Sequence, residues 1–138
     1  MASREIIQTG TRLDLGRVPN EVTGDIVPIS PAARIGDVVY TAGLVAADPD
    51  TGRVVEGGFE AQAERVLDNL RIVLEAAGSS MDKVAKVNVF LADIEADFAT
   101  FNTIYSRYFP DEFPARTAVQ ARLAFDALRV EVEAIAST

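Results

Sequence analysis

Apolar residues in two parts of the chain recur with the spacing of an α-helix. Across residues 59–77 they follow steps of three and four, and most charged residues lie between them. Gly78 comes next, and glycine commonly ends a helix. The same spacing runs over residues 96–108, where aromatic residues make up the apolar stripe, and prolines follow it. The pattern predicts two amphipathic helices, each with one side to bury.

Strict alternation of apolar and polar residues predicts β-strands elsewhere. Two apolar runs around Gly36-Asp37 form a hairpin signal, because glycine suits the positive φ of tight turns. Further short strands are predicted at residues 5–9, 83–91, 116–123 and 128–134. The link between the last two is short enough for a hairpin, which would place both polar sides on one face. Residues 10–25 lack any sustained period and are predicted to form a loop.

The predicted order of elements is strand, two strands, helix, strand, helix, two strands. Two amphipathic helices need a sheet face to cover, so the fold class expected is α+β. We therefore predict a single domain over residues 1–138, with a mixed six-stranded sheet and both helices on one face. Residues 1–25 would contribute a strand and the long loop, and residues 26–136 the core.

Composition narrows the chemistry that this domain can perform. The 138 residues are 49% hydrophobic and 25% charged, which is ordinary for a soluble globular domain. The chain has no Cys and no His, which excludes thiol chemistry and His-dependent triads and argues against transition-metal sites. The formal net charge of −8 argues against nucleic-acid binding. No long apolar run is present, so we expect a cytoplasmic protein without membrane association.

The polar positions of the two C-terminal strands carry the candidate chemistry. They hold Arg116 and Glu131, together with further charged and amide residues (Gln120, Arg122, Arg129 and Glu133). One interpretation is a solvated face with cross-strand ion pairs. In the other, Arg116 binds an anion, because its planar fork donates paired hydrogen bonds to a carboxylate, while Glu131 handles a proton or a water. The pattern alone leaves both interpretations open.

Several motifs, in order and spacing, resemble the RidA/YjgF family. FPARTAV at residues 113–119 and RVEVEAIA at 129–136 are similar to its C-terminal signature, and IGDVVYTAG at 35–43 to its early hairpin. Further short matches follow the same order (DPDTG at 48–52, LDNL at 67–70, EAAG at 75–78 and FATFN at 98–102). The likeness covers roughly residues 26–136.

This resemblance implies a chorismate-mutase-like α+β fold and a homotrimer with clefts between its subunits. It implies hydrolysis of reactive enamines and imines, such as 2-aminoacrylate, to 2-oxoacids and ammonia, without a cofactor. By the same resemblance, Arg116 anchors the carboxylate of a small-molecule substrate and Glu131 positions the water. Gly43, Asn102 and Ala118 match positions near the family's pocket.

Two positions depart from the family's deaminases. Many of those carry a tyrosine where this chain has Ile29, and a serine where it has Ala42. Both changes remove a hydroxyl, and the 10–25 loop also looks longer than usual. The alternatives are therefore a trimer that binds a small carboxylate without turnover, or an enzyme with a diverged substrate. A ribonuclease activity, attributed to some relatives, is disfavoured by the charge and the lack of His.

Overall fold

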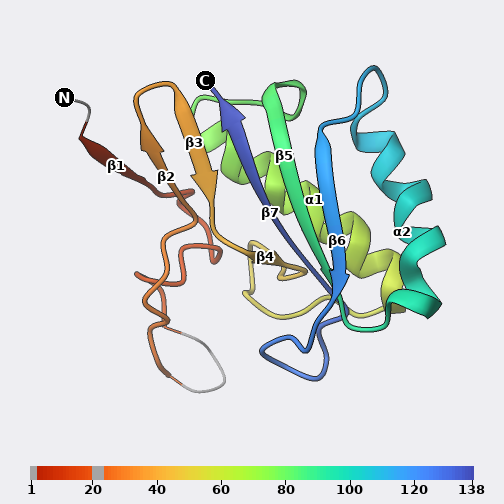
Figure 1. The fold of residues 1–138 in the computed structure, drawn as a ribbon. Coiled ribbons are helices and arrows are strands. Elements are labelled where there is room, and N and C mark those ends of the chain that lie inside the picture. Colours follow the sequence, from red (N-terminus) through yellow and green to blue (C-terminus); the bar gives the residue numbers. More distant parts are fainter. Residues whose placement is uncertain (1–2, 20–23) are drawn as a thin grey trace.

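A computed structural model describes residues 3–19 and 24–138 of the chain. It contains both predicted helices and all six predicted strands, together with one additional strand. The elements are, in chain order, β1 (Arg4–Ile7), β2 (Ala32–Ile35), β3 (Val38–Thr41), β4 (Leu44–Val45), α1 (Gly58–Ala76), the 3-10 turn η1 (Met81–Lys83), β5 (Val84–Leu91), α2 (Ile94–Tyr108), β6 (Ala115–Gln120) and β7 (Val130–Ser137) (Figure 1).

The strands form one sheet in the order β1-β2-β3-β7-β5-β6, and β4 pairs with β7 beyond the end of β3. The sheet is mixed, as predicted, because β5 and β6 run parallel while the other pairs are antiparallel. It has seven strands rather than six. The extra strand, β4, is only two residues long, too short for an alternation of apolar and polar residues to reveal it.

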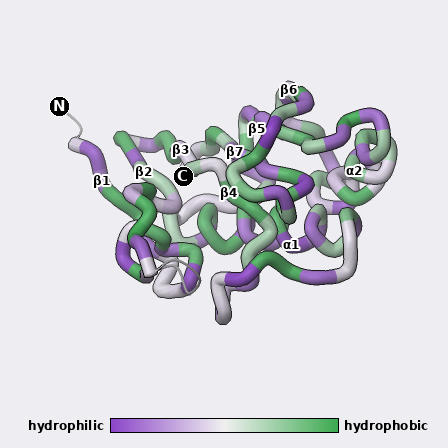
Figure 2. Tube along the Cα trace, turned by 90° about the horizontal axis from the view of Figure 1, so that it is seen from below, coloured by the Kyte–Doolittle hydropathy of each residue, from purple (hydrophilic) through white to green (hydrophobic). Residues whose placement is uncertain are grey.

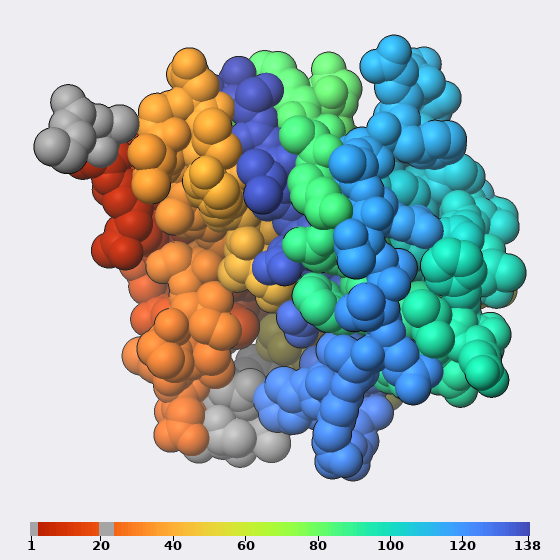
Figure 3. All heavy atoms as spheres, viewed as in Figure 1, coloured from red at the N-terminus to blue at the C-terminus, as the bar shows by residue number. Residues whose placement is uncertain are grey.

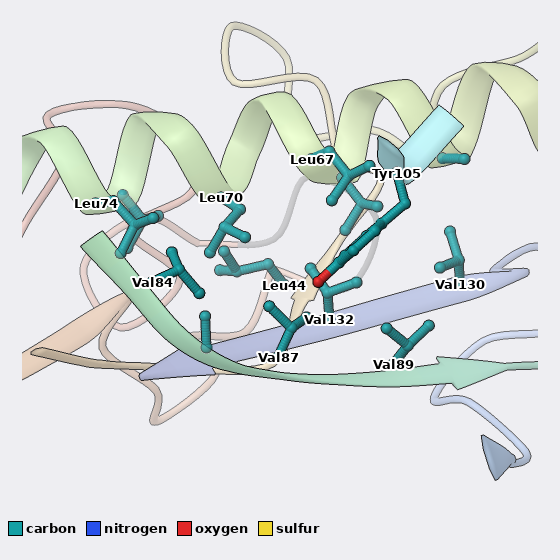
Figure 4. Close-up of a cluster of buried hydrophobic side chains, with 14 of the residues drawn as sticks. Leu44, Leu67, Leu70, Leu74, Val84, Val87, Val89, Tyr105, Val130 and Val132 are labelled. Atoms are coloured by element: carbon teal, nitrogen blue, oxygen red, sulfur yellow. The ribbon is translucent and has the colours of Figure 1, made fainter. Parts of the chain in front are cut away.

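Both helices lie on one side of the sheet and leave the other side open (Figure 2). Leucines of α1, among them Leu67 and Leu70, meet the valines of β5 and β7 in the core (Figure 4). The helix α2 begins two residues before the predicted start, because the Asp93 side chain accepts a hydrogen bond from the Ala96 N–H and caps it. Gly78 ends α1 with a φ of 80°, as its position predicted.

The predicted C-terminal hairpin is wrong. Strands β6 and β7 do not pair, because β5 lies between them, parallel to β6 and antiparallel to β7. The link at 121–129 passes around the end of β5: the Ala121 N–H donates to the Leu91 carbonyl, and the Ala92 N–H donates to the Arg129 carbonyl. A third strand inserted between two others leaves no trace in the alternation of either neighbour.

The described part of the 10–25 loop is organised around one buried carboxylate. Asp14, which is 5% exposed, accepts hydrogen bonds from the backbone N–H groups of Thr9 and Gly10, at 2.8 Å each. The neighbouring Leu13 is buried in the core. The segment is a loop without helix or strand over residues 10–19 and 24–25, as predicted, and residues 20–23 lie outside the described part.

Asn69 holds β4 against α1, and its removal should destabilise the fold. Its side chain is fully buried and donates to the carbonyls of Val45 (2.9 Å) and Ala47 (2.8 Å). Asn69→Ala would leave the Ala47 carbonyl buried without a donor, while the Val45 carbonyl keeps the bond from the Ala47 N–H. One such unsatisfied buried group costs about 1–3 kcal/mol. We expect urea unfolding to show that loss, while the exposed control Glu75→Ala stays within about 0.5 kcal/mol of the wild type. Equal stability of the two variants would contradict this role.

Candidate active site

Arg116 lies on the helix side of the sheet, at the edge strand β6. It pairs with Val87 of β5, which is completely buried under the helices, and paired residues of neighbouring strands share a face. Its Nη2 donates to Oδ1 of Asn102 on α2, at 2.8 Å. The structure thus brings together Arg116 and Asn102, two of the predicted site residues. Ala118, two residues along the same side of β6, is half-buried against the core.

Aromatic rings of α2 surround the guanidinium of Arg116. Its central carbon lies 4.9 Å from the ring centre of Tyr105, 5.7 Å from that of Phe98 and 5.9 Å from that of Phe101. Such contacts hold a cation in place without using its hydrogen-bond donors. Sequence reasoning assigned these aromatic residues to the core, and it missed their contact with Arg116 because that contact joins separate elements.

A pocket of ≈ 270 Å³ opens beside the guanidinium. It is lined by Arg116 itself and five neighbours (Asn102, Tyr105, Ser106, Phe113 and Pro114). A guanidinium has five N–H donors. Within residues 3–19 and 24–138, Asn102 is its one hydrogen-bond partner, so most donors remain for a ligand. A planar cation with free paired donors in a small, mostly apolar pocket is suited to a carboxylate.

Glu131 lies on the open side of the sheet, with a second group of predicted site residues. It pairs with Val45 of β4 and Phe90 of β5. A Cβ atom added to Gly43 would collide with its carboxylate, so glycine is needed there for this close approach. The Ala42 N–H donates to the Pro31 carbonyl at 2.8 Å, which places Pro31, two residues after Ile29, beside Ala42. The side chain of Ile29 is 44% exposed.

Burial raises the pKa of the Glu131 carboxyl above its ordinary value, and the nearby Glu133 charge raises it further. Glu133→Gln removes that charge and keeps an oxygen to accept from Asn88. If Glu131 acts as a base, the acid side of the kcat/KM profile should move to lower pH in Glu133→Gln, because the Glu131 carboxyl then loses its proton more easily. Measuring kcat/KM against pH for the wild type and for Glu133→Gln checks this. If the fall of kcat/KM at acidic pH is the same in both, the Glu131 carboxyl is not the group whose titration causes that fall.

The expectation that Arg116 and Glu131 share one polar face is wrong for a single chain. Arg116 is level with Val87 and Glu131 with Phe90, three residues apart on β5, so their side chains point to opposite faces. They are two strands apart, roughly 10 Å across the sheet and roughly 10 Å along it. Gln120 also faces the helices, where its side chain accepts from the Ile94 N–H. One chain therefore carries two separate candidate half-sites, one around Arg116 and one around Glu131.

Two further sets of hydrogen bonds connect the helices to the start of the strand that carries Glu131. The sequence analysis did not predict these contacts. Arg129 donates to both carboxylate oxygens of Asp97 on α2, at 2.7 and 2.8 Å. Gln62 of α1 accepts from the Arg129 N–H at 2.9 Å. Both contacts are long-range, so nothing in the local pattern signals them.

The comparisons with known proteins give this geometry its context. A family model described as Endoribonuclease L-PSP matches residues 23–138. A RutC family protein of Pyrococcus abyssi is 45% identical over 112 residues, which cover 80% of this chain and 87% of that protein. The human 2-iminobutanoate/2-iminopropanoate deaminase is 41% identical over 113 residues, 82% of each chain.

Solved structures agree over nearly the whole length. RidA from an Antarctic Psychrobacter species superposes with a TM-score of 0.80 at 36% identity, covering 97% of this chain and 99% of that one. Escherichia coli TdcF, solved with bound serine, has a TM-score of 0.79 at 32% identity and covers 97% and 98%. The fold, the matched residues 23–138 and these relatives together show that the chain belongs to the RidA/YjgF family.

Proposed function

We propose that this protein is an imine deaminase that hydrolyses small 2-imino and enamine acids, of the 2-aminoacrylate type, to 2-oxoacids and ammonia. The observation that carries the proposal is the Arg116 guanidinium, held by Asn102 and three aromatic rings with donors left for a carboxylate. The activity named for the human relative, at 41% identity over 82% of this chain, supports it.

The chemistry needs few groups. An imine carbon is already electrophilic, so water adds to it, the C–N bond breaks, and ammonia leaves from a substrate whose carboxylate is bound by Arg116. Glu131 in its ionised form orients the water, accepts its proton and returns it to the nitrogen that leaves as ammonia. General-base assistance of this kind is typically worth ~10²–10⁴-fold, and fixing the substrate beside the water lowers the entropic part of the barrier.

The two half-sites require a second copy of the chain. We propose that the Arg116 half-site of one protomer faces the half-site of Glu131, Gly43, Ala42 and Ile29 of its neighbour, in the homotrimer that the family resemblance implies. The open sheet face supports association, because no helix covers it in the described chain (Figure 3). Three large apolar side chains are exposed there (Tyr40, 46%; Ile135, 38%; Val119, 43%). The homotrimer, the chorismate-mutase-like type of fold and the cytoplasmic location stay predictions.

Subunit complementation tests the shared site directly. Arg116→Ala and Glu131→Gln protomers are each expected to form nearly inactive assemblies. When they are unfolded together at equal amounts and reassembled, about a quarter of the interfaces of a cyclic oligomer would combine an intact Arg116 with an intact Glu131. Activity near one quarter of wild type is expected, measured by trapping of the imine formed by an amino-acid oxidase. No recovery, in mixtures shown to exchange subunits, would place the site elsewhere.

A second candidate function is binding of a small carboxylate without turnover. The serine bound to TdcF, itself a small carboxylate, favours it, and so do the apolar Ile29 and Ala42, which offer no hydroxyl to orient a water. This alternative predicts that 2-oxoacids raise the Tm by about RT ln(1+[L]/Kd) while imine lifetime is unchanged. Shortening of the imine lifetime by the protein would exclude it.

The family description also names an endoribonuclease. A net charge of −8 repels phosphate backbones, and the chain has no histidine for acid–base catalysis. We therefore expect no retention of RNA in a filter-binding assay, at low or at moderate salt.

A further inference from the structure

The middle of the open sheet face carries two side chains of opposite charge that are not paired with each other. Lys86 of β5 and Glu133 of β7 both line a hollow of ≈ 280 Å³ on this face. The Lys86 ammonium donates to the Thr117 hydroxyl at 2.9 Å, and the Glu133 carboxylate accepts from the Asn88 amide at 3.3 Å. Both of these partners are neutral. Among the residues that the structure describes, neither Lys86 nor Glu133 forms an ion pair.

These two charges lie where the proposed shared site would bring two protomers together. In that arrangement, the β6 edge of one protomer meets Glu131 on β7 of its neighbour. Lys86 reaches toward this edge, because its partner Thr117 directly follows Arg116 on β6. Glu133 lies two residues beyond Glu131 on the same face of β7, roughly 7 Å along the strand. The same approach of β6 to a neighbouring β7 therefore brings Lys86 toward the neighbour's Glu133.

The balance of charge on this face favours a pair between chains. Each chain has a net charge of −8, so copies of it repel one another. On β5, β6 and β7, the open face holds one positive charge, Lys86, and two negative ones, Glu131 and Glu133. A charge buried at an interface without a partner is strongly destabilising. The Glu131 carboxylate lies against Gly43 and is assigned to the water, so Glu133 is the acceptor that remains for Lys86.

We propose that Lys86 of one protomer forms an ion pair with Glu133 of the next, and that these pairs fix how the chains assemble. The occupant of the open face is then a second copy of this chain, and the inference rests on the shared site of the proposed function. In a closed cyclic assembly, each chain offers its Lys86 to one neighbour and its Glu133 to the other, so every such charge is paired. The pair would also hold the Arg116 half-site in register with the neighbour's Glu131.

Reversal of either charge should weaken the assembly. Lys86→Glu and Glu133→Lys each set like charges against one another at every interface, and we expect association to weaken by about 30-fold or more. Sedimentation velocity over a dilution series measures this shift. Lys83→Glu in η1 and Glu75→Lys on α1 are the matched controls. They change the net charge by the same amounts at exposed positions outside the sheet, and they should assemble as the wild type does.

Mixing the two reversed variants shows whether the pair joins different chains. In a mixture of Lys86→Glu and Glu133→Lys chains, each interface between unlike chains regains opposite charges. Oligomers should therefore reappear at concentrations where each variant alone is dissociated. The double variant Lys86→Glu/Glu133→Lys should assemble as the wild type does. Recovery in the double variant without recovery in the mixture would place the pair within one chain and overturn the proposal, and so would single variants that assemble like their controls.

Neutral variants repeat the mixing test if charge reversal prevents folding, which circular dichroism detects. Lys86→Met and Glu133→Gln each leave the opposite charge without a charged partner. Glu133→Gln keeps an oxygen that can accept from the ammonium, so its effect should be the smaller one. An equal mixture of the two variants should associate more tightly than Lys86→Met alone, because some of its interfaces regain the original pair. A mixture no tighter than Lys86→Met would contradict the proposal.

The measured mass of the assembly does not depend on turnover, so this test and that of the deaminase activity can fail separately. A wild type that stays monomeric at every concentration would overturn both the ion pair and the shared site. An assembly that shows the expected dependence on these two charges but hydrolyses no imine would support the ion pair and overturn the deaminase proposal.

Discussion

Arg116→Ala is expected to lower kcat/KM for 2-imino acid hydrolysis by about 10²–10⁴-fold. The reason is the loss of two charge-assisted hydrogen bonds to the substrate carboxylate, each worth ~1.5–3 kcal/mol, where every ~1.4 kcal/mol is a factor of ten. Because Arg116 lies at the edge strand and its guanidinium has one protein hydrogen-bond partner among the described residues, folding should suffer little. Steady-state kinetics with imine trapping, together with a thermal melt, measure both effects.

Two controls make the Arg116 result specific. Arg116→Lys keeps the charge but loses the planar fork, so it should retain only a part of the lost activity. Arg122→Ala removes the same charge from a side chain that is 89% exposed on the 121–129 loop, and it should behave as wild type. If Arg116→Ala hydrolyses imines as fast as Arg122→Ala does, Arg116 does not anchor the substrate.

Glu131→Gln is expected to reduce kcat by about 10²–10⁴-fold with a smaller change in KM, because the amide cannot accept the proton of the attacking water. The same variant should be more stable than the wild type at neutral pH. Burial, and then the Glu133 charge, raise the pKa of the Glu131 carboxyl in the folded chain, so the ionised form carries a cost that the amide does not.

The sign of the pH dependence distinguishes this behaviour from general damage. A carboxyl whose pKa is raised by folding favours the folded state while it is protonated, and that contribution is lost as pH rises from its unfolded pKa through its folded pKa. The stability advantage of Glu131→Gln should therefore disappear at acidic pH. Glu133→Gln serves as the matched control and should keep most of the activity. A Glu131→Gln variant that is both active and no more stable at neutral pH would remove Glu131 from the mechanism and from its buried environment.

In the proposed shared site the same two residues come from neighbouring chains, which fits their separation within one chain. The chain keeps an aromatic-lined cation at one edge of its sheet and a half-buried carboxylate on the open face. In the proposed mechanism, neither half-site alone would both hold and hydrolyse an imine. The Arg129–Asp97 pair ties the residue just before β7 to α2, so the strand that carries Glu131 has a fixed position relative to the helix that holds Asn102. Opposite half-sites on rigid elements are suited to a symmetric assembly.

Local pattern was sufficient for both helices and for six of the seven strands, all but the two-residue β4. The three-and-four spacing of residues 59–77 predicted α1, Gly78 marked its end, and alternation located the strands, because each of these properties depends on residues close in the chain. The motifs around Arg116 and Glu131 also led from the sequence to the family that the comparisons show. Only tertiary structure decided that β5 lies between β6 and β7, and so on which face of the sheet each charged residue sits. Strand pairing joins residues distant in the chain, and a shift by one strand or one residue changes the faces that meet without altering any local period.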